Sequence, residues 1–534
     1  MSADICRLLF MPSFWSDGFC SVTNSRQSSK PIVESDIAIM TALFAYAQPA
    51  HLLINSLAGV AMINAFSTRP NVREFWTFLA AGVNFLIVLS MLPKVLSSEV
   101  LIFQLLTVVP GLSIVFRVDA LSMFLGLTAS SLWIVNSLYS VGYMRAHNEH
   151  SQTRFFSAFA LAIGATMGVA FSGSLFTLFI FYEILTVVTY PLVVHHQNAE
   201  ARAGARRYIV YLLGCSTAFF LTAVILTYSV SGTLEFKPEG ILSGAASHQY
   251  ILLLFFLFIL GIAKSGIMPV HSWLPAAMVA PTPVSALLHA VAVVKVGVFS
   301  VVKILLYVFG VELLKETGIN NILTFMAAFT IITASLVALC QDNLKRRLAF
   351  STVSQLSYIL MSISLLSVAG IKSALVHILF HAYGKITLFF AAGSIYIASH
   401  KTKISQLGGI GWKMPWTMGA FFIGSLSMIG VPPAAGFISK WYLIKGSLQA
   451  GEWMAIGVVI VSSLLNAAYF LPIVYVAFFK EESKNGTEHG TPGESPWPMV
   501  VALVVTATGT LGFFFFPDIP VELSELVVKN LFEG

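Results

Sequence analysis

Residues 259–275 read ILGIAKSGIMPVHSWLP, and residues 428–446 read MIGVPPAAGFISKWYLIKG. Both are apolar stretches that contain a lysine, Lys264 in the first and Lys440 in the second. Each is interrupted by residues that break helices, namely Gly266 and Pro269 in the first and Pro432, Pro433 and Gly436 in the second. Irregular backbone is tolerated at membrane depth only beside a cavity lined by protein or water. A pair of such segments therefore indicates an ion site between two halves of a transporter.

The composition of the whole chain agrees with a membrane protein. Of the 534 residues, 57% are hydrophobic and only 10% are charged. Soluble globular proteins have about 25% charged residues, so this chain cannot cover a soluble surface with ionised groups. Disordered and nucleic-acid-coating proteins are excluded for the same reason, and no nucleic-acid partner is expected.

The chain contains about fourteen apolar runs long enough to cross a bilayer, which takes about 20 residues per helix. We therefore predict an all-α polytopic membrane protein with about 14 transmembrane helices. The runs are 48–67, 75–95, 119–140, 156–172, 174–195, 206–230, 250–268, 284–308, 320–340, 346–365, 373–397, 414–448 (interrupted), 455–479 and 497–516. Residues 98–117 contain Pro110 and Gly111, which favour a hairpin or re-entrant segment over a span.

The distribution of Lys and Arg predicts the orientation. Fifteen lie in loops after odd-numbered spans and five in loops after even-numbered spans. The positive-inside rule places the odd-numbered loops in the cytoplasm. Both termini are then expected on the outer side of a bacterial cytoplasmic (inner) membrane.

Neither a soluble domain nor a thiol site is expected. Residues 1–47 are mixed and polar and form no good signal peptide, and a start at Met40 would remove residues 1–39. Residues 481–496 form a polar loop. No CxxC pair occurs among the four cysteines, Cys6, Cys20, Cys215 and Cys340. Since no soluble domain is predicted, no nucleotide or redox cofactor is expected.

One acid and several lysines lie deep within the predicted spans, where a charge costs roughly 2.5–3.5 kcal/mol on insertion scales. Glu183 is the acid. Lys303 and Lys445 lie near helix ends, so their amines are expected to reach the interface. The lysines without that explanation are Lys264, Lys295, Lys385 and Lys440.

These groups suggest a proton gate with two states. Removal from water favours a neutral amine, whereas an adjacent carboxylate favours the ammonium ion. Movement of Glu183 toward or away from Lys264 would therefore switch the lysine between holding and releasing a proton. The alternative is that Glu183 forms a purely structural pair with a lysine of a neighbouring helix.

Histidines supply further candidate proton stations. His377, His381 and Lys385 stand at i, i+4 and i+8 and so share one helical face. His289 and Lys295 are six residues apart, about 240° around an ideal helix, and are not expected to share a face. His289 remains a candidate proton station, because it could contact water inside the protein. Linking waters are expected at polar residues of the tenth span, namely Ser351, Ser354, Gln355 and Tyr358.

A metal site is not predicted. His195 and His196 are preceded by Leu192, so they form no HxxHH box, and His377 with His381 is an isolated HxxxH. Too few ligands assemble for a di-iron centre, and a nearby lysine would repel a cation.

Five stretches resemble the antiporter-like subunits of respiratory complex I and, more closely, the D subunit of Mrp-type multisubunit cation/proton antiporters. They are LFIFYEILTVVTYPLV, KSGIMPVHSWLPAAMVAPTPVSALLHAVAVVKVGVF, NLKRRLAFSTVSQLSYI, HILFHAYGKITLFFAAG and GVPPAAGFISKWYLI. The resemblance covers residues 48 to about 516, and residues 1–47 have no counterpart.

The resemblance implies fourteen helices with two inverted five-helix repeats and a proton half-channel in each. The regions would be an extension (1–47), helices 1–3 (48–155), a first repeat of helices 4–8 (156–310), a second repeat of helices 9–13 (311–480), and a loop with helix 14 (481–534). Glu183 matches the family acid that pairs with the lysine of the seventh helix, here Lys264. Lysines of the eighth, eleventh and twelfth helices match Lys295, Lys385 and Lys440, with His377 and His381 beside Lys385.

Three features separate the subfamilies. The chain stops about 18 residues past its last span, which disfavours the complex I subunit that carries a long lateral helix. Lys440 stands where another complex I subunit has a glutamate. Ala276 stands where many relatives have an acid, so a proton-entry role is not expected there.

The sequence thus predicts a proton-translocating subunit of a multisubunit Na⁺ or K⁺/proton antiporter, with other membrane subunits as partners and no catalytic site of its own. One alternative is a proton-pumping membrane subunit of an NADH:quinone oxidoreductase or an energy-converting hydrogenase. A second is a single-chain solute transporter.

Overall fold

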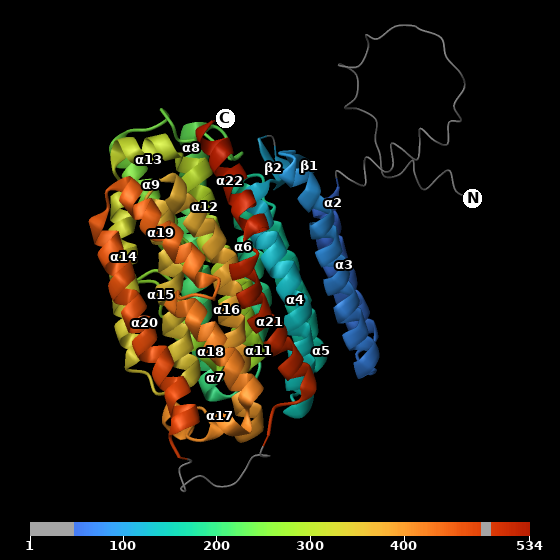
Figure 1. Cartoon of the computed structure of the whole chain (residues 1–534). Coiled ribbons are helices and arrows are strands. Elements are labelled where there is room, and N and C mark those ends of the chain that lie inside the picture. The colour runs from blue at the N-terminus through green and yellow to red at the C-terminus, as the bar shows by residue number, and fades with distance from the viewer. Residues whose placement is uncertain (1–46, 110, 482–492, 534) are drawn as a thin grey trace, which may run out of the picture. The chain divides into compact units, whose positions relative to one another are not determined.

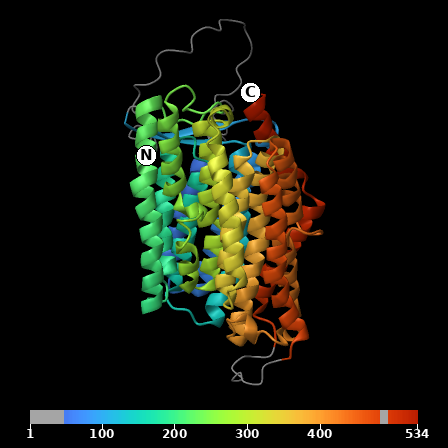
Figure 2. The same ribbon diagram turned by 90° about the vertical axis from the view of Figure 1, so that its left-hand side faces the viewer.

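The computed structural model describes residues 47–109, 111–481 and 493–533. The chain divides into two units, 1–45 and 46–534. The first unit lies outside the described residues, as do Cys6, Cys20, Met40 and most of the predicted polar loop. In the second unit the long helices run side by side in both views (Figure 1 and Figure 2). Among its described residues, ten helices are long and apolar enough to cross a membrane, and two shorter helices are apolar.

The first part of this unit is helical except for one pair of strands. Its elements are α2 (Gln48–Ala65), α3 (Pro70–Leu96), β1 (Leu101–Val109), β2 (Leu112–Val118), α4 (Ala120–Ala146), α5 (Gln152–Ala170), α6 (Leu175–Val193), α7 (Ala199–Cys215), α8 (Leu221–Ser231), α9 (His248–Gly261) and α10 (Trp273–Ala276). A π-helical turn, Ser216–Phe220, joins α7 to α8.

The second part begins with a helix that contains two π-helical turns, Leu287–Val291 and Leu305–Phe309. Its elements are α11 (Thr282–Ala286), α12 (Val293–Ile304), α13 (Val311–Thr317), α14 (Asn320–Leu339), α15 (Leu344–Ser364), α16 (Val368–Ser399), α17 (Ile410–Lys413), α18 (Pro415–Ile429), α19 (Gly436–Ala450), α20 (Trp453–Phe479), α21 (Trp497–Phe515) and α22 (Asp518–Phe532). Figure 1 shows α13 and α17 at opposite ends of the helices.

The predicted all-α membrane architecture is confirmed, since each of the fourteen apolar runs contains a helix. Both predicted breaks are present, between α9 and α10 and between α18 and α19. The segment 98–117 is a hairpin in which β1 and β2 pair antiparallel, with Leu101 opposite Val118. Helix α22 was not predicted, because the search for spans looked for continuous apolar runs, whereas α22 is an amphipathic helix with charges three or four residues apart.

Polar caps determine where several of the helices begin. A side-chain oxygen accepts a hydrogen bond from the first turn in each case, and the capping residues are Asp119 for α4, Ser174 for α6, Asn198 for α7, Asn343 for α15 and Ser367 for α16. Such a cap satisfies one of the orphan backbone donors of the first turn. The caps therefore fix the first residue of α6 and of α16, the helices that carry Glu183 and Lys385.

The two most buried long helices carry most of the predicted proton stations. The most apolar 18-residue window is wholly buried in the segment Thr282–Phe309 and 94% buried in α16. In α3, α6, α20 and α21 the corresponding share is between 33% and 44%. The ionisable residues of α12 and α16 thus face protein rather than lipid, as expected if they serve a path through the interior.

Gly297 of α12 packs directly against the backbone of Lys264. A Cβ at position 297 would overlap the Lys264 carbonyl carbon and the Ser265 nitrogen. Gly297→Ala should push away the turn that carries Lys264, and overpacking of this kind typically costs about 1–3 kcal/mol. We expect a lower melting temperature in detergent for this variant. Gly457→Ala is the control, since its Cβ would meet no atom within 4 Å. Equal melting temperatures for the two variants would contradict the close packing.

Candidate functional site

A line of basic side chains begins where α12 meets α16. Lys295 and His381 are buried, and Lys295 Nζ lies 2.5 Å from His381 Nδ1. At this distance one nitrogen donates a proton and the other accepts it. One turn earlier on α16, the ring of His377 stacks on that of His381, with 5.6 Å between centroids. Three titratable groups are therefore adjacent in the interior.

His289 also faces α16, which the ideal-helix spacing did not predict. Its ring centroid lies 5.0 Å from that of Phe389, and Lys295 contacts His381 of the same helix. The expectation of different faces does not hold, because a π-helical turn and a distorted Ala292 (φ −109°, ψ −79°) separate the two residues. Both ring nitrogens of His289 are buried and make no hydrogen bond.

The line continues from α16 to the second broken helix. His377 Nδ1 lies 2.8 Å from Ser439 Oγ, and Lys440 is the next residue. Lys440 Nζ donates to the carbonyls of Met428 (3.1 Å) and Ile429 (2.8 Å). These carbonyls are free because α18 ends at Ile429, so the break creates the acceptors for the buried ammonium group. Ser439 was not predicted, since a serine beside a lysine carries no distinguishing signal.

Lys264 lies at the first broken helix, just after the end of α9. Its Nζ donates to the Tyr182 carbonyl at 2.5 Å and to Thr186 Oγ1 at 2.7 Å, both on α6. It also lies 3.2 Å from the centroid of the Tyr182 ring. Lys264 is fully buried, and these contacts compensate for the loss of water. Thr186 was not predicted, because a single threonine in an apolar run is usually a packing residue.

Glu183 makes no direct ion pair with Lys264 in this structure, although the two charges interact through space. Both of its carboxylate oxygens are buried, and neither makes a hydrogen bond of ordinary geometry, with the Ser216 side chain as the nearby polar group that stabilises the carboxylate. The resemblance implied a direct pair, but Lys264 instead contacts the residue that precedes Glu183 and the one three positions beyond it. Successive residues point about 100° apart around a helix. The Lys264 amine can therefore lie on the side of Tyr182 and Thr186 or on the side of Glu183, but not on both at once. A buried carboxylate without a close hydrogen-bond partner is costly and is rarely kept without a role.

Lys385 occupies the second turn after His377. Its Nζ donates to Ser351 Oγ at 2.5 Å and to the Leu348 carbonyl at 3.3 Å. Ser351 was predicted to hold water near the stations, and in this structure it is the direct partner of the lysine. Lys385 is fully buried, so α15 supplies the oxygen atoms that its ammonium group requires.

Two of the other polar residues predicted on α15 lie beside the line. Gln355 Nε2 donates to the Met428 carbonyl at 3.2 Å, a carbonyl that Lys440 also contacts. The Tyr358 ring lies 6.0 Å from the His377 ring and 4.8 Å from Lys440 Nζ. Ser354 instead contacts α14, with its Oγ 2.9 Å from Ser335 Oγ.

Lys303 does not reach the interface as expected. It is 1% exposed, and its Nζ donates to the carbonyl of Ser172 at 2.5 Å and to that of Ala170 at 3.4 Å. These carbonyls follow the end of α5, where helix geometry leaves acceptors free. A partner inside the protein was therefore available, and the lysine did not need to extend to water. Lys445 is exposed, in agreement with its expected position.

A cavity of about 390 Å³ lies beside the first broken helix. Its lining includes Arg207, His271, Ser272, Ala276, Arg346 and Phe350. Ala276 thus borders a cavity although it offers no acid there. His271 is the histidine of this lining.

Comparison with known proteins shows the family to which this chain belongs. Residues 172–466 match the family described as NADH:quinone oxidoreductase/Mrp antiporter, TM. NADH-quinone oxidoreductase subunit N of Desulforudis audaxviator is 34% identical over 394 residues, which are 71% of this chain and 77% of that protein. NADH-quinone oxidoreductase subunit L of Mycobacterium tuberculosis is 29% identical over 440 residues, 80% of this chain and 68% of that protein.

Two solved structures share the fold. A chain of the Mrp complex from Dietzia sp. superposes with a TM-score of 0.82 at 22% identity, covering 92% of this chain and 98% of that chain. A chain of the membrane-bound sulfane sulfur reductase, an archaeal respiratory membrane complex, gives 0.80 at 24% identity, covering 90% and 97%. The chain is therefore a multi-pass membrane subunit that belongs to the proton-translocating NADH:quinone oxidoreductase/Mrp antiporter family.

Proposed function

We propose that this chain is the proton-translocating subunit of a multisubunit Na⁺ or K⁺/proton antiporter in a bacterial cytoplasmic membrane. The observation that carries the proposal is the buried line from Lys295 through His381 and His377 to Ser439 and Lys440. Histidine can accept a proton on one ring nitrogen and release it from the other, so a row of imidazoles and amines conducts protons where water is scarce.

The proposed path has two entrances, one for each predicted repeat. Lys264 and Glu183 form the gate of the first repeat (156–310), and Lys385 and Lys440 belong to the second (311–480). Lys295 and His289 lie at the contact between the two, because both approach α16. Waters near Ser354, Gln355 and Tyr358 would complete the connection between Lys385 and Lys440.

The contacts of Lys264 support a gate with two positions. In the described position the amine contacts Tyr182 and Thr186 and makes no direct ion pair with Glu183. In the second position the amine would turn to Glu183, whose charge would hold the proton on it. Binding of the exchanged cation would bias the equilibrium between these positions and so couple the two fluxes.

A second candidate function follows from the names of the relatives. Subunits N and L of NADH-quinone oxidoreductase align over most of this chain, which favours a proton-pumping membrane subunit of a redox complex. In both candidates protons move along the same line of stations. The candidates differ in whether cation exchange or electron transfer drives this movement. Both structural neighbours come from multisubunit complexes, which supports partner membrane subunits and disfavours a single-chain solute transporter.

Vesicles that carry the complete complex distinguish the two candidates. With a pH gradient imposed and no redox substrate present, Na⁺ or K⁺ should collapse the gradient if the complex is an antiporter. A control uses the impermeant cation choline, which should have no effect. If Na⁺ and K⁺ are without effect while electron transfer drives proton uptake, the antiporter proposal is wrong and the redox candidate replaces it.

A further inference from the structure

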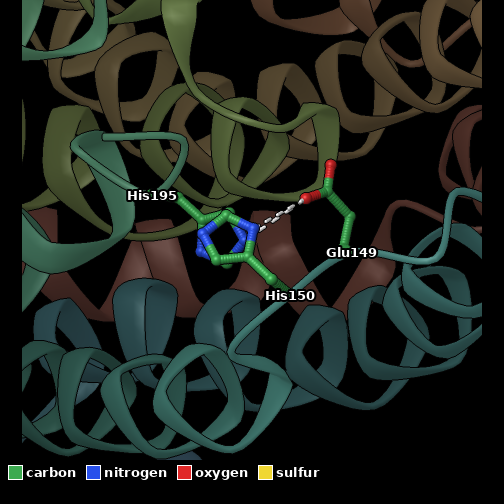
Figure 3. Close-up of side chains that lie close together, drawn as sticks. All are labelled: Glu149, His150 and His195. Carbon is green, nitrogen blue, oxygen red and sulfur yellow. Dashed lines mark ion pairs between the residues drawn. The ribbon is translucent and has the colours of Figure 1, made fainter. Parts of the chain in front are cut away.

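Five titratable side chains gather where the loop between α4 and α5 meets the loop between α6 and α7. They are His147, Glu149, His150, His195 and His196. One carboxylate oxygen, Glu149 Oε2, lies 3.4 Å from His195 Nε2 and 3.8 Å from both His150 Nδ1 and His196 Nδ1. Figure 3 shows the imidazoles of His150 and His195 beside the Glu149 carboxylate. None of these residues belongs to the line of proton stations.

The centre of this group is buried and incompletely bonded. Glu149 is 8% exposed and His195 is fully buried. Neither ring nitrogen of His195 makes a hydrogen bond, and Glu149 Oε1 makes none. Buried polar atoms normally have partners, so three such atoms in one place indicate that a further group binds among them.

We propose that Glu149, His150 and His195 bind a transition-metal dication of the Zn²⁺ class. One ligand atom from each of the first three residues lies within 4.8 Å of the other two. In tetrahedral coordination with bonds of about 2.0–2.1 Å, ligand atoms are about 3.4 Å apart, so small side-chain rotations reach that geometry. Imidazole nitrogen with one carboxylate oxygen is a donor set that suits zinc and its neighbours rather than Mg²⁺ or Ca²⁺.

Metal ligation requires a deprotonated carboxylate and imidazoles with a free ring nitrogen. The nearby cationic groups are Lys345, which acts on His196, and Arg154, which donates to the His195 carbonyl at 3.3 Å.

The site was not predicted because its ligands come from two loops that are far apart in the sequence. The expectation of no metal site rested on the absence of an HxxHH box around His195 and His196. A metal held by Glu149 and His195 would tie the ends of α4 and α5 to those of α6 and α7. Since α6 also carries Glu183, the metal would restrain the helix that bears the proposed gate.

The test measures Zn²⁺ binding to the purified full-length chain in its complex, after removal of metals with a chelator. Calorimetric titration should show one equivalent of Zn²⁺ that binds at least tenfold more weakly to His150→Ala and to Glu149→Gln. The ring of His150 is half exposed, so its removal is not expected to disturb folding. His248→Ala removes an exposed histidine of α9 and is the matched control, which should bind like wild type.

A thermal shift gives an independent reading. Zn²⁺ should raise the melting temperature of wild type and of His248→Ala, but not of His150→Ala. Equal Zn²⁺ affinity in wild type, His150→Ala and Glu149→Gln would overturn the proposal. Because binding is measured without transport, failure of this proposal is distinguishable from failure of the proposed antiport.

Discussion

Replacing Lys264 by alanine should reduce cation-dependent proton exchange by about 100-fold or more, the loss expected when a group that transfers protons is removed. Lys264 is fully buried at a helix break, and its amine is the one that contacts Tyr182 and Thr186. The measurement is collapse of an imposed pH gradient in vesicles that carry the complete complex. Lys445→Ala, which removes an exposed lysine, should leave the exchange rate unchanged.

Replacing Glu183 should also abolish most of the cation-dependent proton exchange, because the proposed gate needs both groups. Its carboxylate makes no hydrogen bond of ordinary geometry in the described position and interacts with Lys264 only through space, so Glu183→Gln is expected to remove the charge without breaking a direct ion pair. If the gate requires the charge, Glu183→Gln should be as inactive as Glu183→Ala. Glu522→Gln, at an exposed position of α22, is the control.

Complex assembly must persist in these variants, which co-purification of the partner subunits would establish. Exchange retained by an assembled Lys264→Ala or Glu183→Gln complex would contradict the gate. Loss of assembly in Lys264→Ala together with full activity in Glu183→Gln would show that the lysine is structural.

The second large effect is expected at the contact between Lys295 and His381. Lys295→Ala and His381→Ala should each slow exchange by about tenfold or more, because each removes one half of the 2.5 Å contact at the start of the line. The double variant should be no slower than the slower single variant. Groups that act as one unit show interaction energies of about 0.5–3 kcal/mol rather than additive losses.

The matched control for this pair is Lys303→Ala. Lys303 is also a buried lysine of α12, but its amine contacts the end of α5 rather than a titratable group. Its removal should lower the melting temperature and leave the exchange rate per folded complex within about twofold of wild type, as for a residue with a structural role alone. Additive losses in the Lys295→Ala and His381→Ala pair would show that the two residues serve separate steps.

Much of the fold was predictable because membrane crossing imposes a simple length and polarity rule. Each apolar run became helical, and the proline and glycine residues of 259–275 and 428–446 marked both breaks correctly. Pro110 and Gly111 predicted a hairpin or a re-entrant segment at 98–117, and the structure has the hairpin. These features depend on local chemistry, since a helix in lipid must satisfy its own backbone hydrogen bonds.

The partners of the buried charges were not predictable in the same way. Lysine side chains reach several ångströms, and helix ends offer free carbonyls whose neighbours depend on packing. Lys303 illustrates this, because it contacts residues that follow α5, more than 130 positions earlier in the chain. His289 shows a second limit, since π-helical turns change the face on which a residue lies without a clear sequence signal.

The sequence by itself determined that this protein is a bundle of membrane helices with titratable residues stranded in apolar segments. It did so because polarity, proline and charge act over a few residues, and their effect can be read along the chain. Only the tertiary structure decided which of these residues meet. Lys295 reaches His381, Lys264 turns away from Glu183, and Glu149 collects histidines from two loops. Such contacts depend on how the helices pack, which is set by many weak interactions acting together across the whole bundle.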